Sequence, residues 1–299
     1  MTQAAPGPGV VGTARPRRTP VADLFEETVR LYRDHFAAMV LVFAAFQIPA
    51  VILTLPLTAL QAPWSQRFYN PTTADVQRAL DDLVPFVGAS VLVGLAAIIL
   101  GSFAAAGVTQ VVGRARNGER PTAREVFPVL RSLAPSILGY VGLIVAAGLL
   151  VGAGFVALGL LLALGTADGS ELGGLLAVVI VLAVIAIAIV AVARFALTIP
   201  ALVVEQLGPI AAFRRSWTLV EGSTWRTFGI VILAGLVMTI IASVATPLYL
   251  PGMMEGIITG SMGSFVLVAL VSGAVQILVG PIVPTLLTVL YFDYEANRL

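Results

Sequence analysis

Arginine and tryptophan side chains gather in one stretch of the chain, where they could bind phosphate groups beside a membrane. The stretch contains Arg214, Arg215, Trp217, Trp225 and Arg226. A guanidinium group is always charged and presents a fork of donors that matches a phosphate, and tryptophan is enriched where a bilayer meets water. Arginines near an anionic leaflet contribute about 1 kcal/mol each to binding. These residues therefore predict a surface for anionic membrane lipids or for a membrane-protein partner.

The residue types that catalysis and metal binding require are scarce. His35 is the single histidine and the chain has no cysteine, so Ser–His and Cys–His catalysis and the common zinc sites lack their parts. Loop carboxylates such as Asp75 and Asp168 do not show the ligand spacing of a calcium site. The glycine pattern that begins at Gly7 leaves no room for the strand that a dinucleotide site needs. We therefore predict no enzymatic activity, no metal site and no cofactor.

The elements that position these residues are six long apolar stretches. Hydrophobic residues make up 59% of the chain and charged residues 11%, against roughly 25% charged in an average soluble domain. A bilayer core takes roughly 20 residues of helix to cross, and six runs without Asp, Glu or Arg exceed that length. We predict an all-α polytopic membrane domain over residues 19–299, after a disordered tail at 1–18. Its six spans are expected at about 37–60, 84–112, 136–165, 173–202, 227–250 and 263–291.

The distribution of basic residues predicts the orientation. All 17 are arginines, and only Arg67 and Arg78 fall outside if the N-terminus is cytoplasmic. Cytoplasmic loops carry the excess of basic residues, so both termini are expected inside. A composition rich in Arg, Ala, Gly, Val and Pro is typical of a high-GC bacterial genome, which places the protein in a bacterial cytoplasmic membrane. Acids interleaved with the arginines, and spans beside them, favour anionic lipid over nucleic acid.

Three segments with helical periodicity each precede a pair of spans. They begin at Pro20, at Thr122 and at Pro209. Each places apolar residues on one stripe and arginines elsewhere, which suits helices in the plane of the lipid headgroups or connecting helices packed under the spans. The expected stripes are Val21, Phe25, Val29, Tyr32 and Phe36, then Val126, Phe127, Leu130 and Leu133, then Ile210, Phe213, Trp217 and Val220. The pattern predicts a threefold unit of amphipathic cytoplasmic helix plus hairpin.

Small residues and prolines inside the spans predict how the helices pack. Gly148 and Gly152 form a GxxxG pair, which allows close approach either within one chain or between two copies in a homo-oligomer. Prolines in the spans are expected to kink or interrupt helices, and such breaks either shape the bundle or mark a transport site. The expected helix breaks are Pro49, Pro200, Pro281 and Pro284.

Few polar side chains lie within the spans. Gln47 and Gln276 could hydrogen-bond across helices, a contact worth about 0.6 kcal/mol on average. Arg194 either lies inside a fourth span that continues to Leu202, or anchors the end of a shorter span at the interface. In both cases a partner is expected, either Glu205 or a lipid phosphate.

The stretch around Arg194 also carries a family pattern. Its residues include Arg194, Phe195, Leu197, Pro200, Ala201, Leu202, Val203, Glu205, Gly208, Pro209, Ala212, Arg214, Ser216, Trp217, Gly222, Trp225, Arg226, Phe228 and Gly229. This stretch, with Tyr291, Phe292 and Asp293 near the end of the chain, resembles the membrane domain fused to some bacterial glycerophosphodiester phosphodiesterases and its stand-alone relatives of unknown function. The resemblance implies a six-span bundle and a connection with lipids. The 299 residues leave no room after the sixth span for the soluble phosphodiesterase barrel, so its activity is not expected here.

The sequence therefore predicts a non-enzymatic integral membrane protein that engages lipid or serves as a membrane scaffold or assembly partner. The alternative is a small-solute transporter or channel subunit, in which the breaks at Pro281 and Pro284 and the side chain of Gln276 line a path.

Overall fold

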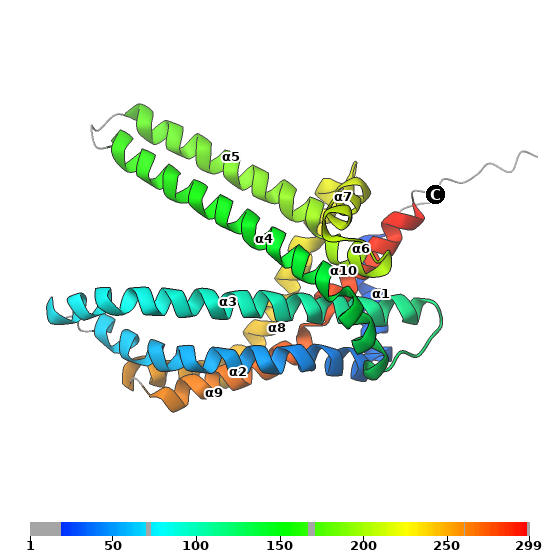
Figure 1. The fold of residues 1–299 in the computed structure, drawn as a ribbon, viewed down its shortest axis with the longest axis horizontal. Helices are drawn as coiled ribbons and strands as arrows, with labels where there is room; N and C mark the ends of the chain where they lie inside the picture. Colours follow the sequence, from blue (N-terminus) through cyan, green and yellow to red (C-terminus); the bar gives the residue numbers. More distant parts are fainter. Residues whose placement is uncertain (1–18, 70–72, 167–170, 260, 298–299) are drawn as a thin grey trace, which may run out of the picture.

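The computed structural model describes residues 19–69, 73–166, 171–259 and 261–297. Within these ranges the chain forms helices and no strand (Figure 1). The helices are α1 (Val21–Asp34), α2 (Phe36–Tyr69), α3 (Thr73–Arg116), α4 (Ala123–Thr166), α5 (Glu171–Phe195), α6 (Thr198–Val204), α7 (Pro209–Val220), α8 (Thr224–Thr259), α9 (Met262–Val279) and α10 (Ile282–Ala296). The predicted tail at 1–18 and the side chains of Arg67 and Arg78 lie outside what the structure describes.

Six helical stretches are long and apolar enough to cross a membrane, which confirms the predicted fold class. They are Phe36–Leu57, Leu83–Arg116, Ala123–Ala157, Val179–Val204, Thr224–Thr259 and Met262–Ala296. Several extend beyond the predicted limits because helix continues through polar residues that flank the uncharged runs. The chain is therefore a multi-pass integral membrane protein.

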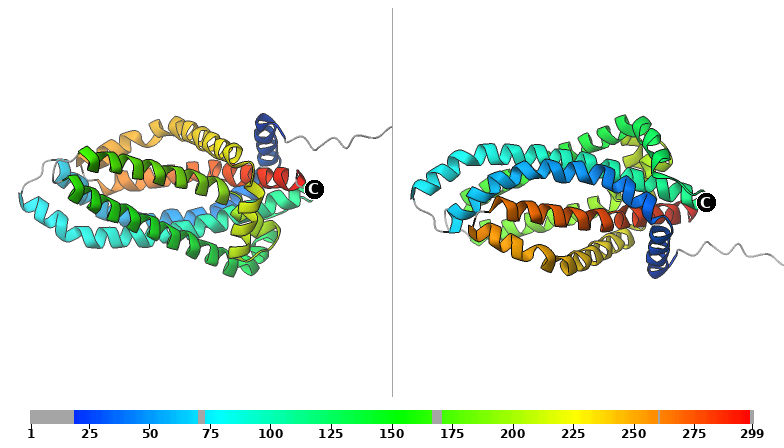
Figure 2. Two further views of the ribbon diagram at one scale, coloured as in Figure 1. Left: turned by 90° about the horizontal axis from the view of Figure 1, so that it is seen from above. Right: turned by 90° about the horizontal axis from the view of Figure 1, so that it is seen from below.

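In the view of Figure 1 the helices converge at one end and spread apart toward the other. Seen from above and below, the long helices run roughly along one axis (Figure 2). We call the converging part the closed end; it consists of α1, α6, α7 and α10 with the adjoining turns of α2, α3, α4 and α8. From it, the α4–α5 hairpin diverges from the group formed by α2, α3 and α9. In the most apolar window of each span, at most 22% of the residues are buried, and in α3 none is. The spans thus expose apolar side chains, as helices surrounded by lipid do.

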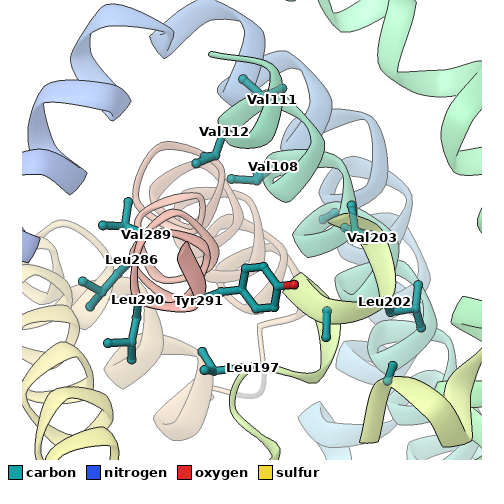
Figure 3. Packing of buried hydrophobic residues seen from close by; sticks show 14 of the residues in the cluster. Val108, Val111, Val112, Leu197, Leu202, Val203, Leu286, Val289, Leu290 and Tyr291 are labelled. Carbon is teal, nitrogen blue, oxygen red and sulfur yellow. The ribbon is translucent and has the colours of Figure 1, made fainter. Parts of the chain in front are cut away.

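The hydrophobic core lies in the closed end and is organised around α10. Figure 3 shows α10 side chains packed between α3 and α6, with the Tyr291 ring directed at α6. The labelled residues of this cluster are Val108, Val111 and Val112 of α3, Leu197, Leu202 and Val203, and Leu286, Val289, Leu290 and Tyr291 of α10. Tyr291 is completely buried. The core therefore fixes α6 and α10, the elements next to the arginine-rich stretch.

Close helix packing uses glycines other than the predicted pair. A Cβ atom on Gly273 would lie 2.5 Å from Val51, and one on Gly280 would lie 2.3 Å from the Phe43 ring, so α2 and the sixth span touch at both glycines. Gly148 and Gly152 have no atom within 4 Å of an added Cβ. The alternative in which these two glycines pack within the chain is therefore wrong for the described residues, and their side of α4 is open.

The prolines have different effects according to their position. The sixth span breaks at Pro281, between α9 and α10, and Pro284 lies in the first turn of α10. Pro200 lies in the first turn of α6, after an interruption of the fourth span. Pro49 does not interrupt α2, so that prediction is wrong. The hydroxyl of Tyr32 on α1 donates to the Leu278 carbonyl beside the Pro281 break, where the last carbonyls of α9 lack helical donors.

Two of the three predicted surface segments are separate helices, α1 and α7. The segment after Thr122 is instead the first part of the uninterrupted helix α4. In α1 the buried residues are Leu24 and Thr28, whereas Val29 of the predicted apolar stripe is 61% exposed. Thr19 does not cap α1; its hydroxyl donates to Asp293. The threefold unit is therefore incomplete in its second member.

Candidate functional site

The outward face of α7 combines apolar and cationic side chains. The helix begins with Pro209 at its first turn after Gly208, a position where the missing amide proton is harmless. Ala212, Ser216, Leu219 and Val220 face the closed end and are buried. Two members of the predicted apolar stripe lie on the opposite side of the helix, because Ile210 is 60% exposed and Trp217 43% exposed. Arg214 is exposed on the same outward face, one helical turn from each of them.

Arg194 is held beside this face at the end of α5. Its Nη1 atom donates to the Trp217 carbonyl at 3.1 Å, and its guanidinium carbon lies 4.6 Å from the centre of the Trp217 ring. The Ser216 hydroxyl donates to the Arg194 carbonyl at 2.7 Å, which joins α7 to α5. The C-terminus of a helix also favours a cation. The guanidinium group is therefore fixed in place by cation–π and backbone contacts.

The charge of Arg194 is not paired with a carboxylate among the residues that the structure describes. Its Nε atom is buried and has no hydrogen-bond partner. Glu205, the predicted protein partner, binds Arg215 instead, so that prediction is wrong. The helix α5 ends at Phe195, directly after Arg194, but the stretch that is long and apolar enough to cross a membrane continues to Val204. Both alternatives for the end of the fourth span therefore stay predictions.

An apolar groove adjoins Arg194. Its volume is about 600 Å³, and it lies between α4 and α5 with α7 at one end. Phe195 and Phe213 line it, and their rings are 5.1 Å apart in an edge-on arrangement. Phe195 is also 5.7 Å from the Trp217 ring. Gly148 lines the opposite wall. The aromatic side chains thus connect Arg194 to the groove. The groove is open on the α4 side because small residues such as Gly148 line it there.

Arg215 points away from the α7 outward face and into the closed end. Its Nε atom lies 2.5 Å from Glu205, and a second nitrogen lies 3.6 Å from Glu295 of α10. The Tyr291 hydroxyl donates to the same Glu205 carboxylate. The hydrogen bond with Glu205 is the main cause that raises the pKa of Arg215, and burial opposes it. This side chain therefore joins α7, α6 and α10 rather than facing lipid as predicted.

Arg226 is also turned into the closed end. Its Nη1 atom donates to Asp293 at 2.9 Å, and Nη2 donates to the Thr19 carbonyl at 2.6 Å. The two charged side chains are only 19% and 4% exposed. Trp225, the neighbouring residue on α8, is 76% exposed. The five predicted surface residues thus separate: Arg214 and Trp217 share one face, Trp225 is exposed on α8, and the other two arginines are structural.

Sequence reasoning identified Arg194 as a charge that needs a partner, but it missed the role of Asp293. Asp293 is the first charge after the uncharged run at 256–292, and Arg226 is the last charge before the run at 227–254. Opposite charges that border two spans at the same membrane surface are a signal that could have identified the pair. For Arg194 the signal was its position at the end of the run at 172–193, without an acid close to it in sequence.

Gln47 and Gln276 lie at a separate location. Both line a cavity of about 500 Å³ between α2, α3 and α9. Neither side chain makes the predicted hydrogen bond across helices in the part of the chain that the structure describes. In the same part, no group of three or more His, Asp or Glu side chains could hold a metal ion.

The fold and this site define an integral membrane protein with six candidate spans, in which Arg194 pairs with no carboxylate among the described residues and lies beside an apolar groove. Residues 36–294 match the family described as Domain of unknown function (DUF7847), and the chain belongs to that family. No curated protein and no solved structure matches it. The resemblance to phosphodiesterase-associated membrane domains stays a prediction.

Proposed function

We propose that the protein binds an anionic phospholipid on the outward face of α7. In this proposal Arg194 and Arg214 bind the phosphate, Trp217 lies at the interface, and one acyl chain occupies the groove between α4 and α5. The closed end faces the cytoplasm of a bacterial cell, as the arginine distribution predicts. The role is binding, either as an end in itself or as the basis of a scaffold for a membrane partner, and not catalysis.

The observation that carries the proposal is the state of Arg194. A buried donor without a partner is costly, and more so when the group is charged. Arg194 has such a donor in Nε, and the rest of its guanidinium group is held by Trp217. Because Nε itself is covered by the protein, a ligand would bind at the outer nitrogens of the guanidinium group, where anionic oxygens would balance its charge.

The groove supports a lipid over a soluble anion. It begins at Phe195, which is adjacent to Arg194 in sequence, and continues along α4 past Gly148. Its lining is apolar, so it suits a hydrocarbon chain and offers nothing to inorganic phosphate. A phospholipid supplies the anion and the chain in one molecule.

The test is retention of lipid by the purified protein. The protein is placed in nanodiscs of dioleoylphosphatidylglycerol and dioleoylphosphatidylcholine and released from them in a native mass spectrometer. The lipids that stay bound to it are then identified. Two arginines at about 1 kcal/mol each correspond to about a 30-fold difference in affinity. We expect the Arg194→Gln/Arg214→Gln variant to lose the phosphatidylglycerol that the wild type retains.

The matched control is Arg30→Gln/Arg33→Gln, which removes two exposed arginines on α1 that do not line the groove. It should retain phosphatidylglycerol as the wild type does. Equal retention by the double variant and the wild type would refute the proposal. Equal losses in the control and the double variant would show that only net charge matters, and would refute the assigned site.

Small-solute transport is the second candidate function, and one observation favours it. Gln276 lies close to the break at Pro281 and lines two cavities, and broken helices form substrate sites in many transporters. A solute flux in proteoliposomes that disappears with Gln276→Leu would establish this function.

A further inference from the structure

A second site lies at membrane depth, between α2, α3 and α9. The cavity of about 500 Å³ is lined by apolar side chains and by Gln47, Thr54, Ser272 and Gln276. The hydroxyl of Thr54 donates to the Val51 carbonyl at 2.6 Å, and that of Ser272 to the Ala269 carbonyl at 3.2 Å. The hydroxyl groups are thus satisfied within their own helices, and only the two amides remain.

The two glutamine amides make no hydrogen bond within the described residues. Gln47 lies near the middle of the span Phe36–Leu57, where the surroundings are hydrocarbon and offer no partner. A polar group transferred to such surroundings without a hydrogen bond is unfavourable, and the bilayer core contains no water to replace the bond. Gln276 is exposed and turned to the same cavity. The amides therefore require a partner that this chain does not supply.

A second cavity begins at the same glutamine. It has a volume of about 560 Å³ and lies between α5, α8, α9 and α10. Its lining is apolar except for Gln276 and Thr239, and the Thr239 hydroxyl donates to the Gly235 carbonyl at 2.8 Å. Gln276 therefore stands between a cavity with polar groups and a cavity suited to hydrocarbon.

We infer that Gln47 and Gln276 bind the hydroxyl group of a neutral membrane lipid of the diacylglycerol class, with a chain of that lipid in the apolar cavity. A primary amide both donates and accepts hydrogen bonds, which matches a hydroxyl group. Neither cavity is lined by a charged side chain, so an ionic headgroup would be buried without a counter-ion. Both volumes lie in the range of small-molecule sites, roughly 300–1,000 Å³.

This inference is independent of the proposed anionic lipid site. The anionic site is built from α5 and α7 with the groove on α4, whereas the neutral site depends on the amides of α2 and α9. Substitutions at one site leave the side chains of the other unchanged, so the two can fail separately.

The test uses nanodiscs of phosphatidylcholine that contain dioleoylglycerol, with native mass spectrometry of the released protein. We expect the wild type to retain dioleoylglycerol and the Gln47→Leu/Gln276→Leu variant to retain at least about tenfold less, a change of about 1.4 kcal/mol. The matched control is Gln77→Leu, an exposed glutamine on α3 outside both cavities. It should retain the lipid as the wild type does.

A second measurement uses the unaltered chain and so does not depend on folding of the variants. A diacylglycerol that carries a photoreactive diazirine on one chain is cross-linked in nanodiscs, and the labelled residues are identified. Labels on the lining of the apolar cavity, such as Met238 and Val279, are expected. Labels confined to other surfaces would overturn the inference.

Diacylglycerol would bind through a neutral hydroxyl group, and a small polyol such as glycerol carries the same group. Glycerol entry into proteoliposomes is therefore measured by light scattering in the same variants. No glycerol entry is expected. Glycerol entry that requires both glutamines, without retention of dioleoylglycerol, would overturn the lipid assignment, as would unchanged retention by the folded double variant.

Discussion

Replacement of Asp293 by alanine would test how the closed end is held together. This carboxylate accepts hydrogen bonds from the Thr19 amide and hydroxyl and from Arg226, and it also contacts the Asn297 amide. Its side chain is 4% exposed, and that of Arg226 is 19% exposed. The contact between Arg226 and Asp293 joins α8 to α10, 67 residues apart in the chain. The contact between Thr19 and Asp293 joins the segment before α1 to α10, 274 residues apart.

The magnitude follows from the charge that remains. Without Asp293, Arg226 keeps only the Thr19 carbonyl and the face of the Tyr294 ring at 5.3 Å. Breaking a buried ion pair by removal of one partner destabilises a protein by about 3–5 kcal/mol. Because Arg226 retains some contact with solvent, we expect the lower limit, about 3 kcal/mol, in the free energy of unfolding.

The assay is unfolding in detergent micelles, by heat and by added sodium dodecyl sulfate, followed by circular dichroism. The comparison pair is Arg33–Asp34, which is separated by 3.8 Å with side chains 81% and 51% exposed. Asp34→Ala should leave the stability almost unchanged, because exposed pairs contribute little. An Asp293→Ala variant that is as stable as Asp34→Ala would refute the structural role of the Arg226–Asp293 pair.

Three further predictions concern packing, the groove and orientation. Gly280→Ala should destabilise the protein by about 1–3 kcal/mol, because a Cβ there overlaps the Phe43 ring. Gly148→Ala should leave the stability unchanged, because a Cβ there meets open space. Equal melting temperatures for the two variants would contradict the packing at Gly280. Gly148→Leu should fill the groove and reduce phosphatidylglycerol retention without loss of stability, whereas full retention would exclude the groove as the chain site. The chain has no cysteine, so single cysteines can report the orientation. Arg120→Cys should react with an impermeant maleimide only after the cells are permeabilised, whereas Met262→Cys should react in intact cells. The reverse pattern would show the opposite orientation.

The sequence was sufficient for the six spans because each depends on local composition. An uncharged run such as 256–292 identifies a membrane-crossing stretch without knowledge of its neighbours. The start of α7 at Pro209 and the break at Pro281 were also predictable, because proline restricts the backbone at its own position. These features use information from a few adjacent residues.

Features that depend on which helices become neighbours were not predictable in the same way. Periodicity placed Ile210, Phe213 and Trp217 on one apolar stripe of α7, but it did not show that the core accepts the small residues Ala212 and Ser216. In a membrane protein an apolar side chain is equally suited to lipid and to a helix neighbour, so apolar periodicity does not identify the buried face. Gly280 packs closely and Gly148 does not, although both are glycines in apolar helices.

The candidate site was partly predictable for the same reason. Arg214 and Trp217 were identified as surface residues because composition alone marks them. Arg215 differs from Arg214 only by one position along α7, yet it pairs with Glu205. That difference is set by the position of α6, which no local pattern in the sequence specifies.

The most direct test of the lipid-binding account is quenching of Trp217 fluorescence by brominated lipid. The chain has three tryptophans, so Trp217 is the only one that remains in a Trp64→Phe/Trp225→Phe background. Bilayers are prepared in which bromine is carried either by the chains of phosphatidylglycerol or by those of phosphatidylcholine, at equal bromine content. Preferential quenching by the brominated phosphatidylglycerol, lost in Arg194→Gln/Arg214→Gln, is the predicted result. Equal quenching by the two lipids would contradict an anionic lipid site at α7.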